Sequence, residues 1–83
     1  MSDSGTAARL RGVLAQVLGV PAATIGQETS ADTVGSWTSL NHLMLISQVE
    51  ETFGVVFSNQ QIRDLTSYDK LLSAVAAQTM SES

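Results

Sequence analysis

Apolar residues recur at helical spacing in the first part of the chain. From Thr6 onward they occupy positions i, i+3, i+4, i+7 and i+8, namely Leu10, Val13, Leu14, Val17 and Leu18. This spacing is that of one apolar helical stripe and predicts a helix over residues 6–18. Gly19 then supplies a stop signal, and the residue before Pro21 is restricted to extended backbone.

Residues 20–38 lack periodicity and are rich in glycine, serine and threonine. This composition predicts a long loop that crosses the bundle. Ile25 and Val34 are apolar points in this polar stretch, so we expect them to anchor the loop on the core. Trp37 ends the loop. There it either shields a site at the start of the next helix or contacts partners, or it plugs the loop against the bundle.

The second helix is predicted over residues 39–53, with Thr38 as N-cap and Gly54 as C-cap. Ser58 to Gln61 have the S-x-x-Q form of a capping box and predict a short helix that carries Ile62 and Leu65. A further capping signal in residues 66–69 opens a last helix, whose apolar positions are Tyr68, Leu71, Leu72, Val75 and Ala76. The fold class is therefore all-α, a four-helix bundle of three long helices and one short helix. We expect one domain over residues 6–78, with flexible tails at residues 1–5 and 79–83.

The helix at residues 39–53 has more apolar surface than packing requires. Leu45, Ile46, Val49 and Phe53 complete a core-facing stripe, and a second apolar face adjoins it at Leu40, Leu43 and Met44. Either this second face is an exposed patch for docking, or the bundle wraps the whole helix.

Composition narrows the classes of function. The 83 residues are 43% hydrophobic without an apolar stretch of membrane-spanning length, and no secretory signal opens the chain, so we expect a cytoplasmic monomer that binds no membrane. Eight acidic residues against four basic ones give a net charge of -4, which disfavours nucleic acid and favours a partner with a basic face. The absence of cysteine and the single histidine leave no metal site.

Ser39 lies in the first turn of the second helix, where backbone N–H groups and the helix dipole favour an attached anion such as a phosphate ester. From the residues alone, the alternative is that Ser39 is only a cap or a solvent-exposed first-turn residue, which is what most serines at helix starts are. His42 shares the helix face of Ser39 and could act as a base for a serine nucleophile. No third residue orients this histidine and no oxyanion hole is indicated, so we predict no catalytic residue and place His42 at the surface, near whatever Ser39 carries.

The ordered set of motifs resembles acyl and peptidyl carrier proteins across almost the whole chain. Ser39-Leu40 matches the S-L of the family's D-S-L motif, and residues 50–55, Glu-Glu-Thr-Phe-Gly-Val, resemble its E-E-x-F-G-[IV] helix end. The pattern W-x-S-L-x-H-x-x-L-I over residues 37–46 is most similar to discrete carriers of polyketide and other secondary-metabolite pathways.

This resemblance implies that Ser39 bears a covalent 4'-phosphopantetheine arm derived from coenzyme A, with Trp37 and His42 near the arm. The partners it implies are a phosphopantetheinyl transferase and enzymes that load, transfer or condense acyl groups. The residues it places in partner docking are Thr38, Leu40, Leu43, Met44, Glu50 and Glu51.

Two features depart from the family. Thr38 stands where the motif has aspartate, which removes a negative charge beside Ser39. The second helix also has only two carboxylates, so binding is expected to depend on apolar contacts more than on charge. The rival hypothesis is an unmodified helical interaction module that uses the same apolar face.

Overall fold

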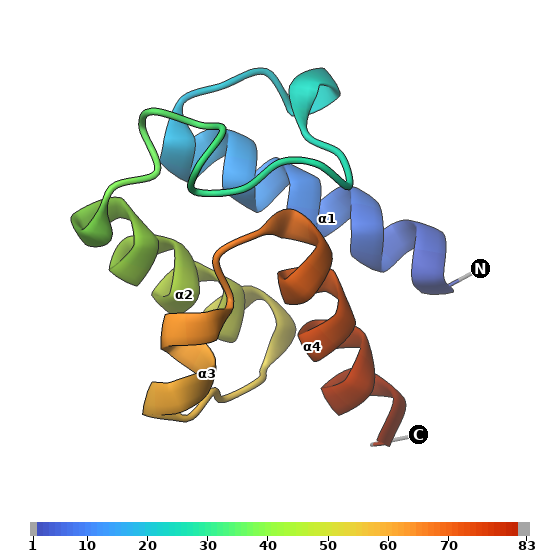
Figure 1. Cartoon of the computed structure of the whole chain (residues 1–83). Helices are drawn as coiled ribbons and strands as arrows, with labels where there is room; N and C mark the ends of the chain where they lie inside the picture. The colour runs from blue at the N-terminus through green and yellow to red at the C-terminus, as the bar shows by residue number, and fades with distance from the viewer. Residues whose placement is uncertain (1, 82–83) are drawn as a thin grey trace.

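The described part of the chain is built from α-helices joined by a long first loop. The computed structural model describes residues 2–81 and orders them as α1 (Ser2–Leu18), the 3-10 helix η1 (Ala22–Thr24), α2 (Ser39–Phe53), α3 (Asn59–Asp64) and α4 (Tyr68–Ser81) (Figure 1). Three of the α-helices are long and α3 is short, so the predicted all-α, four-helix fold is confirmed. Within these residues no helix has the length and apolar content needed to cross a bilayer. The same stretch contains no cluster of three or more His, Cys, Asp or Glu side chains that could hold a metal ion.

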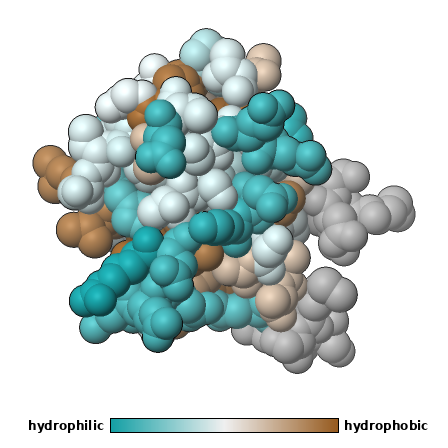
Figure 2. All heavy atoms as spheres, viewed as in Figure 1, coloured by the Kyte–Doolittle hydropathy of each residue, from teal (hydrophilic) through white to brown (hydrophobic). Residues whose placement is uncertain are grey.

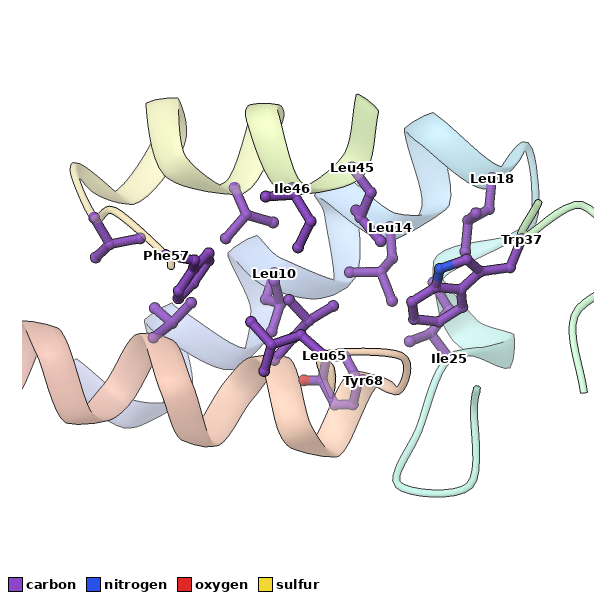
Figure 3. Close-up of a cluster of buried hydrophobic side chains, with 14 residues drawn as sticks. Leu10, Leu14, Leu18, Ile25, Trp37, Leu45, Ile46, Phe57, Leu65 and Tyr68 are labelled. Carbon is purple, nitrogen blue, oxygen red and sulfur yellow. The ribbon is translucent and has the colours of Figure 1, made fainter. Parts of the chain in front are cut away.

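One hydrophobic core joins the helices and the loop. Helix α1 packs against both α2 and α4, and Leu10 and Leu14 point from it into the centre of the cluster (Figure 3). Leu45 from α2 and Leu71 from α4 are also completely buried. The predicted core stripes of α1, α2 and α4 thus meet in one place, and burial of this apolar area is the main force that holds the fold.

Both α1 and α2 end at a glycine in the left-handed region. Gly19 has φ 67° and Gly54 has φ 66°, a conformation that costs about 1–2 kcal/mol for a residue with a side chain. Helix α2 begins after Thr38, whose hydroxyl accepts a hydrogen bond from the Asn41 N–H at 3.2 Å. The predicted bounds and caps of this helix are confirmed.

The long first loop is fixed to the rest of the molecule by backbone and side-chain bonds. Its middle pairs with the segment that joins α3 to α4, through hydrogen bonds from the Ala31 N–H to the Thr66 carbonyl and from the Tyr68 N–H to the Thr29 carbonyl. The Ser36 hydroxyl donates to the Leu18 carbonyl at 2.7 Å. Ile25 is buried in the core. Val34 packs against the core as expected, so the loop delivers Trp37 and Ser39 to a defined position.

Two helix ends differ from the predictions. Helix α1 begins at Ser2 rather than Thr6, and α4 continues to Ser81, so the backbone of residues 2–5 and 79–81 is helical where tails were expected. Residues 2–5 contain only polar residues and glycine, so apolar spacing could not reveal the helix there. The tail residues Met1, Glu82 and Ser83 lie outside the described residues.

Candidate functional site

Ser39 is the first residue of α2 and is exposed to solvent. Within residues 2–81 its hydroxyl has no hydrogen-bond partner, because the neighbouring Thr38 caps the helix. The first N–H groups of a helix have no intrahelical acceptor. Helix α2 also contains no acidic residue in its first turn. The local field at Ser39 is therefore positive and the serine oxygen is accessible.

An apolar surface begins immediately beside Ser39. Leu40, Leu43 and Met44 are 69%, 58% and 54% exposed, whereas Leu45 and Val49 on the opposite side of α2 are completely buried. In Figure 2, hydrophobic atoms interrupt the polar surface at the edge where α2 lies in Figure 1. The bundle does not wrap the whole helix, so the second interpretation of its excess apolar surface is wrong, and a docking role for the exposed face stays a prediction. We call Leu40, Leu43 and Met44 the α2 apolar face.

A groove of about 380 Å³ lies between the start of α2 and α3, and Ser39 is one of its lining residues. Its walls include the apolar side chains of Trp37, Leu43 and Ile62, and among the described residues Arg63 is the one charged residue that lines it. A larger hollow of about 710 Å³ lies among the residues of the first loop and does not include Ser39. The groove, although smaller, is the hollow of the two that Ser39 lines.

His42 of α2 also lines this groove and forms hydrogen bonds to the end of the first loop and to α3. Its Nδ1 accepts a hydrogen bond from the Trp37 indole N–H at 3.0 Å, and its Nε2 lies 2.5 Å from the Ile62 carbonyl oxygen. Because an indole can only donate, Nδ1 carries no proton and Nε2 donates to Ile62. Through these two bonds the imidazole holds both the end of the loop and α3 against α2.

This network corrects the expected place of His42. The residue is half-buried rather than a free surface group, and both ring nitrogens already have partners. Neither nitrogen is available as a base for Ser39. Trp37 is only 5% exposed and lies with Leu18 and Ile25 at the loop end of the core (Figure 3). Trp37 therefore plugs the loop against the bundle. Because it also lines the groove beside Ser39, its role near the arm or towards partners stays a prediction.

The two carboxylates at the end of α2 differ in their surroundings. Glu50 is half-buried, and its Oε2 accepts a hydrogen bond from the Phe57 N–H at 2.9 Å. Glu51 is exposed. Glu50 therefore fixes the turn between α2 and α3, and Glu51 is the freer carboxylate of the pair. A docking role for these residues stays a prediction.

Sequence reasoning missed Arg63. This residue is exposed in the last turn of α3, yet it lines the same groove as Ser39. The two residues are far apart in the sequence, and no spacing rule brings them together. The available signal was the scarcity of basic residues, because only four occur in the chain.

Comparison with protein families places this site in a known context. Residues 8–75 match the family model described as the phosphopantetheine attachment site. The chain belongs to this family. Its members are the acyl and peptidyl carrier proteins, and the matched domain is the place of covalent 4'-phosphopantetheine attachment. The protein is therefore a carrier with a phosphopantetheine arm. Comparison with curated proteins gives no significant match.

Carrier domains of this family act with phosphopantetheinyl transferases and biosynthetic enzymes, and they are generally not catalysts themselves. The arm contains a phosphodiester, a short branched hydrocarbon, two amides and a thiol. The residues around Ser39 fit such a group: an accessible hydroxyl, helix N–H groups and an arginine suit the phosphodiester, and the apolar groove suits the hydrocarbon. The described residues that line the groove are neutral or basic, so no carboxylate among them would repel an anion attached to Ser39.

Proposed function

We propose that Ser39 carries the 4'-phosphopantetheine arm and that the protein presents an acyl group to biosynthetic enzymes. In the attachment reaction the Ser39 oxygen forms a bond to the pyrophosphate phosphorus of coenzyme A that bears pantetheine. The bond from that phosphorus to the bridging oxygen breaks, and adenosine 3',5'-bisphosphate leaves. The serine proton passes to a base of the transferase. The terminal thiol of the arm, once attached, holds the acyl group as a thioester.

The observation that carries this assignment is the free, exposed hydroxyl of Ser39 at the start of α2. Four other serines, at turns and helix starts, have hydroxyls that already make hydrogen bonds. These are Ser30, Ser36, Ser58 and Ser67. Esterification of these residues would compete with bonds that cap helices or hold the loop.

Two exposed serines lie inside helices and fit the chemistry less well. Ser47 is in the middle of α2 and Ser73 is in α4. Their neighbouring N–H groups donate within the helix, so neither position offers the unsatisfied donors and positive field that Ser39 has. The position of Ser39 in the family's motif supports the same choice.

The α2 apolar face supports a docking role. Leu40, Leu43 and Met44 occupy positions i, i+3 and i+4 and form one exposed stripe beside Ser39. A partner that covers this stripe is brought directly to the arm, and Thr38 and Glu51 offer polar contacts at its edges. We infer that a transferase and acyl-handling enzymes of a polyketide or related secondary pathway dock here, and that the carrier acts as a cytoplasmic monomer.

The test is intact-mass spectrometry after incubation of the full chain with coenzyme A and a promiscuous phosphopantetheinyl transferase. We expect the native protein to gain one arm. A chain that stays unmodified under conditions in which a known carrier is fully converted would contradict the proposal. That result would favour an unmodified interaction module that uses the α2 apolar face.

A further inference from the structure

The groove beside Ser39 has a distribution of charge that suits one kind of ligand. Within the part of the chain that the structure describes, Arg63 is its one charged lining residue and no carboxylate lines it. The first turn of α2 contributes no acid, and Thr38 beside Ser39 is neutral. The positive end of α2 and the basic residue Arg63 therefore border the same small space, and no carboxylate is among its described lining residues.

A phosphodiester on Ser39 would introduce an anion into this space. Arginine matches phosphate oxygens through its planar set of donors and remains charged at all relevant pH values. Of the anions that could reach Arg63, the phosphodiester on Ser39 is the one whose position is fixed by a covalent bond to a residue of the same groove. Its local concentration at Arg63 is consequently high.

The remaining walls suit the next portion of the arm. Beyond the phosphate, phosphopantetheine has a carbon with two methyl groups, and Leu43 and Ile62 supply apolar walls for it. The wall on α3 has a defined position, because the Ile62 carbonyl is bonded to His42 Nε2 of α2. The groove, at about 380 Å³, falls within the size range of small-molecule sites.

We propose that the inner part of the arm lies in the groove between α2 and α3, with its phosphodiester paired to Arg63. This inference rests on the proposed attachment at Ser39 and goes beyond it, because an arm attached there could equally project into solvent. Arg63 is then a positioning residue, which sets the direction in which the arm leaves the protein.

The test uses nuclear magnetic resonance of the full-length protein. Amide spectra of the unmodified and modified forms are compared for the native chain and for Arg63→Gln, Arg63→Lys and Arg11→Gln. Intact mass first establishes that each modified sample carries the arm. Because each variant is compared with its own unmodified form, the shift caused by the substitution itself cancels.

In the native protein, attachment is expected to shift the amides of Ile62, Arg63 and Thr66, and high salt should reduce these shifts. Arg63→Gln should lower them at least twofold, and Arg63→Lys should keep more of them because it retains the charge. Arg11→Gln, which changes a basic residue of α1 outside the groove, should leave them as in the native protein.

Two outcomes would overturn the inference, and they are separable. Complete attachment without shifts on α3, or with equal shifts in native protein and Arg63→Gln, would mean that the arm does not pair with Arg63. The proposed function would be unaffected. Failure of the native chain to gain an arm would instead overturn the proposed function and this inference together.

Discussion

The indole N–H of Trp37 donates to Nδ1 of His42 at 3.0 Å, and the two rings stack with centroids 6.1 Å apart and an interplanar angle of 28°. This pair connects the last residues of the first loop to the first turns of α2. Ser39 lies between the two residues in sequence, so the contact defines the backbone that presents it.

His42→Phe should lower the free energy of unfolding by about 1–3 kcal/mol, because the buried indole N–H loses its acceptor. Urea unfolding followed by tryptophan fluorescence measures the loss. Gln48→Ala changes an exposed residue of the same helix and should stay within about 0.5 kcal/mol of the native protein. Equal stabilities of the two variants would show that the hydrogen bonds of His42 do not stabilise the site.

Met44→Glu should impair acyl loading or transfer by partner enzymes while it changes stability by no more than about 0.5 kcal/mol, because the side chain is 54% exposed. Leu43→Glu should behave in the same way towards partners. Leu45→Ala is the matched control from the buried side of α2 and should cost about 2–5 kcal/mol. Thermal melts and a loading assay separate the two effects. Normal handling of Met44→Glu by every partner tested would remove the α2 apolar face from docking.

Helix α2 shows how much of the site could be predicted from the sequence. Its ends follow from local chemistry, since a threonine hydroxyl caps the start and a glycine with positive φ ends it. Its two apolar faces also follow from spacing. Whether the second face is exposed or also buried depends on how the other helices pack, so periodicity alone left that choice open.

The remaining features of the site depend on contacts between distant residues. The bond of His42 to the Ile62 carbonyl joins residues 20 positions apart, and no sequence pattern encodes a bond to a particular backbone carbonyl. Glu50 was predicted only as a partner contact because the turn that brings the Phe57 N–H to its carboxylate could not be seen. Arg63 was missed for the same reason: its place in the groove follows from the packing of α3.

Thr38→Asp should keep α2 capped and hold or slightly raise stability, by about 0.3–1 kcal/mol, because both residues cap well and a carboxylate is favourable at a helix N-terminus. If a basic residue of the transferase binds this carboxylate, arm attachment should be faster than in the native chain. The advantage should shrink with salt, which screens charges over about 8–10 Å. Time courses at low and high salt test this. Equal rates in all conditions would mean that the transferase finds Ser39 through the α2 apolar face alone.

The central claim is that Ser39 is the attachment residue, and peptide mapping by mass spectrometry after transferase treatment tests it most directly. The native chain should carry the arm on the peptide that contains Ser39. Ser39→Ala should carry none, although its fold and melting temperature should be nearly unchanged, because the exposed hydroxyl makes no hydrogen bond within residues 2–81 and alanine suits a helix. An arm on a different serine, or one retained by the folded Ser39→Ala protein, would contradict the account.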